Sequence, residues 1–131
     1  MDVIIIDDDK FMKTVFSNLF KDQEISFDVY EDPHEGLESI SSNRPHCAII
    51  DYNMPALNGD DLIVLSSQRL QFSHTDFIMI TGEEFSEMDR MKLMTLGFQY
   101  IFSKKELRSE KFINTINEIL ETHKTEVKKS A

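Results

Sequence analysis

The sequence predicts an α/β protein with a doubly wound fold, in which five helices cover both faces of a parallel sheet of five strands. Two observations predict it. Short apolar runs rich in β-branched residues alternate five times with segments of helical period, and the connections between them are short. At 131 residues the chain has the length of a single domain. In such folds ligands bind outside the carboxyl ends of the strands.

Five apolar runs are predicted to be the strands: VIII (3–6), ISFDVY (25–30), CAII (47–50), FIMI (77–80) and YIF (100–102). The first, third and fourth runs are continuously apolar, which is typical of strands covered on both faces. The second run alternates apolar with polar residues, so we expect it at the edge of the sheet.

The segments between the runs have helical period. Apolar residues recur with this period from Phe11 to Phe20 and again over 112–120, and shorter patterns cover about 33–42, 59–71 and 86–96. These five segments are the predicted helices.

Residues with known capping preferences stand at several helix ends. Asp8 or Asp9 is predicted to cap the first helix and Ser86 the fourth, and Gly97 follows the fourth helix. After residue 121 the apolar period is lost. We therefore expect one domain of residues 1–121, followed by a frayed or disordered tail of residues 122–131.

Composition narrows the possible partners and the compartment. Fourteen basic and twenty-four acidic residues give a net charge of −10, which disfavours binding to nucleic acids or membrane surfaces. A single cysteine, Cys47, cannot form an internal disulfide, and the chain has no membrane-spanning run and no signal sequence. We expect a cytoplasmic protein whose partners are proteins or cations.

Polar residues follow each predicted strand: Asp7–Asp9, Glu31 and Asp32, Asp51, Thr81 and Gly82, and Ser103–Lys105. Carboxylates from the first and third strand ends are hard oxygen ligands that suit Mg²⁺. A threonine hydroxyl and a lysine ammonium beside them can donate to phosphoryl oxygens. Asp51 stands alone at its strand end, so it is the candidate nucleophile, which would form an aspartyl-phosphate.

Together these residues resemble the response-regulator receiver domain of two-component signalling, in particular its single-domain, chemotaxis-regulator-like members. The resemblance covers about residues 2–120 and is carried by four motifs: IIIDDD (4–9), DYNMPALNG (51–59), ITGEE (80–84) and GFQYIFSK (97–104). It implies a flavodoxin-like fold with strand order 2-1-3-4-5. It also implies a phosphoprotein that is not an enzyme, apart from slow autodephosphorylation.

The resemblance assigns the metal and acceptor roles residue by residue. Asp7 and Asp8 match the acidic pair that holds Mg²⁺, and Asp51 matches the phosphoacceptor. Asn53 matches the position whose backbone carbonyl also binds the metal. Asp9 matches no metal ligand of the family, which leaves it available to cap the first helix.

The resemblance also assigns residues that respond to the phosphoryl group. Thr81 matches the hydroxyl that moves toward that group, and Lys104 matches the lysine that pairs with it. The side chains of Asn53 and Glu83 stand where the family tunes the rate of autodephosphorylation. Ile101 occupies the position of the family's switch aromatic, with Tyr100 expected on the opposite face of the strand.

One further departure from the family pattern concerns the residue after Lys104. The family usually has a proline there, in a cis peptide, and this chain has Lys105. A cis bond before a residue other than proline costs about 2.5–4 kcal/mol. We therefore expect a trans peptide and a loop of different shape.

The resemblance implies that a histidine kinase or histidine phosphotransfer protein phosphorylates Asp51. The switched face would be formed by the segments 86–96, 100–102 and 112–120, and would bind a downstream protein or a second copy of the chain. No output segment follows residue 120, so the output would be a protein contact. The chain can equally be a domain of a longer protein.

Two other functions remain open. The first is a receiver that is never phosphorylated and acts as a fixed interaction module, because the proline and the switch aromatic are missing. The second is an aspartate-dependent phosphohydrolase, because Asp7 and Asp9 form a D-x-D after the first strand, although Phe11 stands where such enzymes have Thr or Val. Substitution of Asp51 distinguishes these readings.

Three methionines in the segment 86–96 allow two interpretations. Met88, Met91 and Met94 could form an adaptable surface for a partner. Their spacing favours core packing for Met91 and Met94, next to Leu93.

Overall fold

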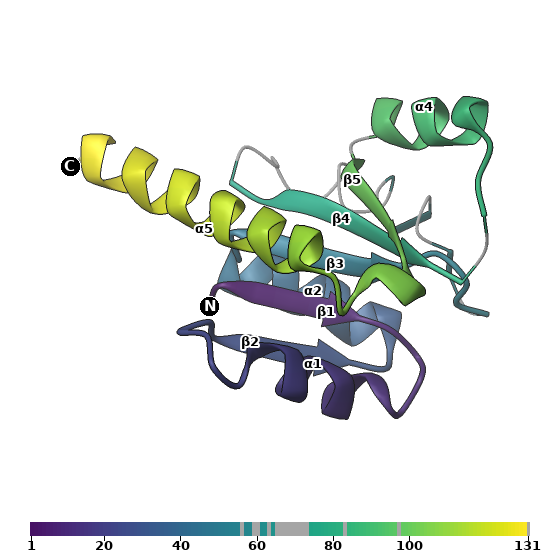
Figure 1. Cartoon of the computed structure of the whole chain (residues 1–131), viewed down its shortest axis with the longest axis horizontal. Helices are drawn as coiled ribbons and strands as arrows, with labels where there is room; N and C mark the ends of the chain where they lie inside the picture. The colour runs from purple at the N-terminus through teal and green to yellow at the C-terminus, as the bar shows by residue number, and fades with distance from the viewer. Residues whose placement is uncertain are drawn as a thin grey trace.

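A single parallel sheet organises the molecule. The computed structural model describes residues 1–55, 57–58, 61–62, 64, 74–82, 84–96 and 98–130. Its five strands lie in the order β2-β1-β3-β4-β5 (Figure 1). The strands are β1 (Val3–Ile6), β2 (Phe27–Tyr30), β3 (Cys47–Asp51), β4 (Asp76–Thr81) and β5 (Phe98–Ser103). The predicted fold class and strand order are confirmed.

Helices cover both faces of this sheet. The described helices are α1 (Met12–Phe20), α2 (Pro33–Asn43), α4 (Glu87–Thr95) and α5 (Glu110–Ser130), with a short 3-10 turn, η1 (Lys104–Glu106). Figure 1 shows α1 and α5 on the near face of the sheet and α2 behind it. Most of the helix predicted over 59–71 lies outside the described residues. None of the described helices is long and apolar enough to cross a lipid bilayer.

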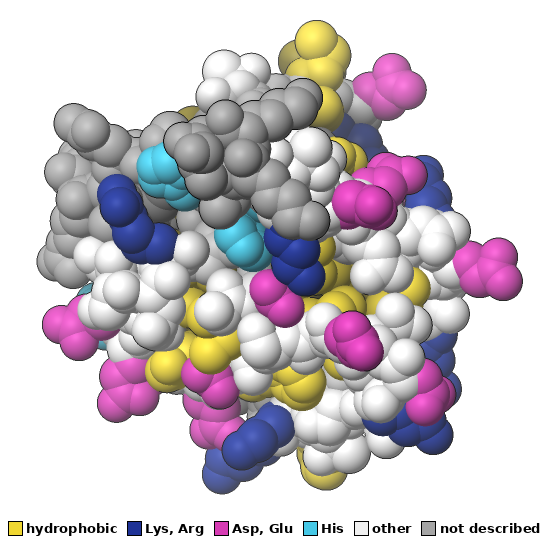
Figure 2. Space-filling model, turned by 90° about the vertical axis from the view of Figure 1, so that its left-hand side faces the viewer, with side chains coloured by type: hydrophobic (Ala, Val, Ile, Leu, Met, Phe, Trp, Pro, Cys, Tyr) yellow, Lys and Arg dark blue, Asp and Glu magenta, His cyan; other side chains and the backbone are white. Residues whose placement is uncertain are grey.

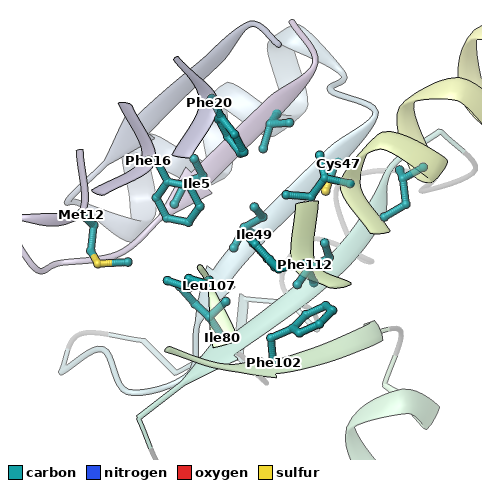
Figure 3. Close-up of a cluster of buried hydrophobic side chains, with 14 of the residues drawn as sticks. Ile5, Met12, Phe16, Phe20, Cys47, Ile49, Ile80, Phe102, Leu107 and Phe112 are labelled. Atoms are coloured by element: carbon teal, nitrogen blue, oxygen red, sulfur yellow. The ribbon is translucent and has the colours of Figure 1, made fainter. Parts of the chain in front are cut away.

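The core consists of two clusters, one on each face, because successive residues of a strand point to opposite faces. In β1, Val3 and Ile5 pack on the side of α1 and α5, whereas Ile4 and Ile6 pack on the side of α2 and α4. Figure 3 shows the first cluster, in which Phe16 of α1 and Phe112 of α5 lie over Ile5 and Ile49. All four residues of β1 are fully buried, which explains its unbroken apolar run.

Close packing of α2 on the sheet depends on Gly36. A Cβ atom at Gly36 would lie 2.6 Å from Cγ1 and 2.7 Å from Cδ1 of Ile6, which is fully buried and stiff at χ1. We expect Gly36→Ala to lower the free energy of unfolding. Overpacking costs about 1–3 kcal/mol, more than the roughly 1 kcal/mol that alanine gains in a helix. Chemical denaturation measures the change.

Gly82→Ala is the matched control, because a Cβ atom there meets nothing within 4 Å. Its stability should stay within about 0.5 kcal/mol of the wild type, as for ordinary surface substitutions. A Gly36→Ala protein as stable as the Gly82→Ala protein would contradict this account of the packing.

Several predicted boundaries need correction. The strand predicted from Ile25 begins at Phe27, and the last strand is longer than predicted and begins at Phe98. A bulge between Phe77 and Ile78 shifts the register of the β4–β5 pair, which allows β5 to remain paired over this length. The segment 33–42 is helical as predicted, and Asp32 caps it by accepting a hydrogen bond from the backbone N–H of His34.

The predicted cap of the first helix is wrong. The N-cap residue of α1 is Phe11, which makes no side-chain capping bond. Asp9 instead closes the turn before the helix, because its carboxylate accepts a hydrogen bond from the Phe11 N–H at 2.9 Å. For the fourth helix the prediction is confirmed, since the Ser86 hydroxyl accepts from the Asp89 N–H. Gly97 lies outside the described residues.

Helix α5 does not end near residue 121 as expected but continues to Ser130. His123 anchors this continuation: it is 9% exposed, its ring lies 5.1 Å from that of His46, and its Nε2 lies 3.3 Å from Oδ2 of Asp76. Burial, together with the nearby His123, lowers the pKa of His46. Figure 2 shows histidine side chains among charged residues on this side of the molecule. The last part of α5 is therefore held to the rest of the protein by polar contacts of His123, which the pattern of apolar residues could not reveal.

The interpretation of Met91 and Met94 as core residues is also wrong. Met88, Met91 and Met94 are 81%, 68% and 56% exposed. Of the residues of α4, only Leu93 is buried. The three methionines form an exposed apolar surface, which is called the methionine face of α4 below.

Candidate functional site

Four polar side chains meet at the carboxyl edge of the sheet. Asp7 follows β1, Asp51 ends β3, Thr81 ends β4, and Lys104 follows β5. Because the strands are parallel, their carboxyl ends share one edge and bring these residues together. Asp7 and Asp51 are almost completely buried, which is rare for carboxylates unless they are paired, and Thr81 is equally buried.

Three carboxylates form a potential cation site at this edge. One oxygen from each of Asp7, Asp8 and Asp51 lies within 4.8 Å of the other two. Asp8 is exposed and opens the cluster to solvent, whereas Asp7 and Asp51 are buried. Asp9 does not belong to this group, since its carboxylate caps the turn at Phe11.

The carboxylate of Asp7 is incompletely satisfied. Its Oδ1 accepts a hydrogen bond from the Asp9 N–H at 2.9 Å, whereas Oδ2 is buried and accepts no well-aligned hydrogen bond. Within the described part of the chain, an ion pair with Lys104 offsets the charge of Oδ2. A donor set made only of carboxylate oxygens, two of its three residues buried, fits a hard divalent cation.

Lys104 lies between the two buried carboxylates. Its Nζ is 3.1 Å from Oδ2 of Asp7 and 3.5 Å from Oδ2 of Asp51. Its side chain is 30% exposed, so an incoming group can approach it. A negatively charged group bound to Asp51 would therefore lie next to the Lys104 ammonium.

A capped turn positions Lys104 in place of the proline loop of the family. All described peptide bonds are trans, as expected for the bond before Lys105. Ser103 and Glu106 form a capping box, in which the Ser103 N–H donates to Oε1 of Glu106 at 3.0 Å. The S-x-x-E pattern of this box is present in the sequence and could have predicted the turn.

Burial raises the pKa of Asp7 to about 6. The neighbouring Asp51 contributes to this net rise, while the hydrogen bond from Asp9 and the charge of Lys104 oppose it. The pKa of Lys104 is raised as well. Although its own burial lowers its pKa, the charges of Asp7 and Asp51 raise it on balance, so the ammonium remains charged at neutral pH.

The raised pKa of Asp7 predicts how the stability of the metal-free protein depends on pH. From pH 3.8, the ordinary pKa, to about 6, the folded state retains a proton that the unfolded state has released. The contribution of Asp7 to the free energy of unfolding therefore falls as pH rises through this window. Chelator-treated Asp7→Asn protein should lack this contribution, and thermal melts at pH 4 and pH 7 measure the difference. Equal pH dependence in both proteins would contradict the prediction.

The remaining predicted residues lie around this centre. The backbone N–H of Asn53 donates to Oδ1 of Asp51 at 3.3 Å, which places Asn53 beside the acceptor. Ile101 faces the cluster of α2 and α4, while Tyr100, paired with Ile78, faces the other side, as expected. Glu83 lies outside the described residues.

A cavity of about 510 Å³ adjoins this centre. It lies between the residues that follow β4 and those that follow β5, and its lining includes Thr81, Phe85, Arg90, Lys104 and Lys105. Phe85 was not singled out from the sequence. The sequence around Phe85 does not indicate a role for it, because the aromatic ring that it contacts, Tyr52, is remote in the chain.

Comparisons with known proteins agree with this geometry. The model of a protein family described as "Response regulator receiver domain" matches residues 3–125. A comparison with curated proteins finds no match.

Solved structures share the fold. One is the signal receiver domain of a putative Luxo repressor protein from Vibrio parahaemolyticus, with a TM-score of 0.86, 18% identity, and coverage of 99% of this chain and 97% of that one. Another is the chemotaxis protein CheY4 of Vibrio cholerae, with a TM-score of 0.78, 21% identity and coverage of 90% and 97%. A third is the receiver domain of the Francisella response regulator 1452, with a TM-score of 0.78, 24% identity and coverage of 92% and 97%.

Proposed function

Because the chain belongs to the response regulator receiver domain family of two-component signalling, we propose that Asp51 accepts a phosphoryl group in a reaction that depends on Mg²⁺. The donor would be a histidine kinase or a histidine phosphotransfer protein. The observation that carries the proposal is the position of the Lys104 ammonium, within 3.5 Å of Asp51 and beside the acidic cluster.

The acidic cluster would hold the metal. Asp7, Asp8 and Asp51 would supply carboxylate oxygens, and Asn53 its backbone carbonyl. A bound Mg²⁺ neutralises charge on the phosphoryl oxygens and lowers the repulsion between an anionic donor and the buried acids.

The transfer itself needs a nucleophile in line with the leaving group. A carboxylate oxygen of Asp51 attacks phosphorus, and the bond from phosphorus to the histidine nitrogen of the donor breaks. The electron pair of that bond stays on the imidazole, which takes up a proton when it leaves as the anion. Lys104 and the Thr81 hydroxyl would donate to the phosphoryl oxygens, which stabilises the charge that gathers on them.

Hydrolysis of the aspartyl-phosphate would return the protein to its initial state. The backbone N–H of Asn53 donates to Asp51, so this residue lies next to the acceptor. We propose that Asn53 and Glu83 tune this rate. We also propose that the protein acts as a phosphoacceptor, as is typical of receiver domains, with slow autodephosphorylation as its one reaction besides acceptance.

Phosphorylation would switch a protein-binding face formed by α4, β5 and α5. The methionine face of α4 supports this, since Met88, Met91 and Met94 are exposed and methionine adapts to irregular partner surfaces. The downstream partner is then another protein, or a second copy of the chain in a homodimer. A net charge of −10 disfavours nucleic acids and anionic membranes as partners.

Phosphoryl incorporation from acetyl phosphate tests this proposal. Intact-mass measurement should detect one phosphoryl group on the wild type with Mg²⁺, and none after chelation or in Asp51→Asn. Absence of incorporation and of any response to beryllofluoride would favour the fixed interaction module. Sustained phosphate release that survives Asp51→Asn and stops in Asp7→Asn would favour the phosphohydrolase. The place of Asp9 outside the acidic cluster argues against this last outcome.

A further inference from the structure

Two aromatic side chains connect the candidate acceptor with α4. Tyr52 follows Asp51 directly, and Phe85 directly precedes Ser86, the N-cap of α4. Their ring centroids are 5.0 Å apart and their planes are 87° apart, an edge-to-face contact. Aromatic pairs prefer this geometry, in which the positive ring edge meets the negative ring face. The contact therefore joins the loop after β3 to the loop after β4, two loops that are far apart in the sequence.

Both rings are held by contacts with neighbouring elements. The Tyr52 N–H donates to the Ile80 carbonyl at 3.0 Å, which ties Tyr52 to the strand that ends in Thr81. Tyr52 and Phe85 are half-buried against the core cluster of α2 and α4. Phe85 also lines the cavity that reaches Thr81 and Lys104. The cavity, about 510 Å³ in volume, therefore lies directly beside the ring of Phe85.

Helix α4 depends on few contacts. Leu93 is its only buried residue, and its methionine face points to solvent. Leu96 and Phe85, at its two ends, add half-buried contacts with the same core cluster. An element with so little buried surface shifts at low cost, so a single contact at its N-terminus can determine where it lies.

We propose that the Tyr52–Phe85 contact is the positioning element through which the state of Asp51 sets the position of α4. Before phosphorylation the edge-to-face contact holds the N-terminus of α4 beside the acceptor loop. When Thr81 and Lys104 turn toward a phosphoryl group on Asp51, the loop after β4 follows, and Phe85 leaves Tyr52 and enters the cavity. Helix α4 then moves, and its methionine face is presented differently.

This inference rests on the proposed phosphorylation of Asp51, but not on an aromatic residue in β5. Ile101 has no ring and no hydroxyl, and it packs against the same cluster as Phe85. It can adjust to a new position of Phe85 without making a polar contact of its own. Tyr52 and Phe85 are positioning residues, because neither is proposed to touch the phosphoryl group.

A fluorescent label on α4 tests the proposal. Met91→Cys introduces a thiol at an exposed site, while Cys47 stays unlabelled because it is fully buried and burial raises its thiol pKa. In this background the label should respond to beryllofluoride with Mg²⁺. Phe85→Leu and Tyr52→Leu should each remove most of that response, whereas Tyr52→Phe, which keeps the ring, should retain it.

The matched control is Phe27→Leu, which removes an edge-to-face contact of similar geometry, with Phe20 at 5.2 Å and 76°, on the far edge strand. It should leave the response of the label unchanged. Phosphoryl incorporation from acetyl phosphate, measured by mass on each variant, should continue in all of them.

The outcomes separate the two proposals. Full response of the label in Phe85→Leu and Tyr52→Leu would overturn the role of the aromatic contact, and so would a wild-type label that does not respond although Asp51 is phosphorylated. In both cases the proposed function would stand. Absence of phosphoryl incorporation in the wild type would overturn the proposed function, and this inference with it.

Discussion

Lys104→Met is expected to slow phosphoryl acceptance by Asp51 about 100-fold, the usual effect of removing one charge-stabilising donor from a reaction site. Lys104 faces Asp51 at 3.5 Å and Asp7 at 3.1 Å. Methionine keeps much of the length of the side chain but removes the ammonium. The initial rate of incorporation from acetyl phosphate, followed by mass, measures the effect.

The same substitution should destabilise the metal-free protein. Breaking a buried ion pair leaves an unpaired charge and costs about 3–5 kcal/mol, and the partial exposure of Lys104 reduces this to about 1–2 kcal/mol. The pKa of Asp7 should rise further, because the favourable charge of Lys104 is gone.

Lys105→Met is the matched control for Lys104→Met. Lys105 is the next residue and is exposed, and none of the described ion pairs includes it. Its loss makes the same chemical change at the mouth of the cavity without altering the buried cluster. Equal rates of acceptance in the two variants would show that charge near the site matters and that the position of Lys104 does not.

Asp7→Asn is expected to weaken Mg²⁺ binding by about 100-fold or more, since even the loss of a group that only supports a metal ligand costs 10–100-fold. Asp7 is the most deeply buried acid of the cluster, and its Oδ2 atom has no well-aligned hydrogen bond. An asparagine offers only one neutral oxygen to the metal. Titration calorimetry with Mg²⁺ measures the loss.

Without metal, Asp7→Asn should be more stable than the wild type at pH 7. The buried charge of Asp7 and its repulsion with Asp51 both disappear, and burial is the main reason that its pKa is raised to about 6. Mg²⁺ should raise the melting temperature of the wild type, because it binds only the folded state, and should leave that of Asp7→Asn nearly unchanged.

Asp9→Asn is the control for Asp7→Asn. It has the same chemistry two residues away, and its carboxylate caps the turn at Phe11 outside the acidic cluster. Asparagine can accept the same hydrogen bond, so both stability and Mg²⁺ binding should stay close to the wild type. Equal loss of Mg²⁺ binding in both variants would contradict the assignment of the cluster.

The sequence was sufficient to predict the strands and the residues that stand at their carboxyl ends. The unbroken apolar run of β1 and the polar residues after β1, β3, β4 and β5 predicted which side chains meet at the carboxyl edge. Asp7, Asp51, Thr81 and Lys104 meet there in the structure. This works because parallel strands share one carboxyl edge, whatever the details of packing are.

Features that depend on contacts between remote residues were not predictable in the same way. Met91 and Met94 have a helical spacing that suits a core, yet α4 presents them to solvent, since only Leu93 reaches the sheet. The continuation of α5 depends on His123, which meets His46 and Asp76 from other elements. The spacing of apolar residues along one helix contains no information about which residues of other elements it will contact.

The loop after β5 is an intermediate case. The missing proline correctly predicted a trans peptide at Lys105. It also predicted a loop of different shape, and in this loop the capping box of Ser103 and Glu106 holds Lys104 against Asp7 and Asp51. The S-x-x-E pattern was available in the sequence, so this part of the site could have been predicted from local rules.

The central claim is that Asp51 itself becomes phosphorylated, and chemical trapping tests it most directly. The wild type is incubated with acetyl phosphate and Mg²⁺, reduced with borohydride, which converts an aspartyl-phosphate into homoserine, and digested for peptide mass mapping. The account predicts homoserine at position 51 and at no other aspartate. Homoserine at position 7, or no conversion in a sample that is fully folded and supplied with Mg²⁺, would contradict it.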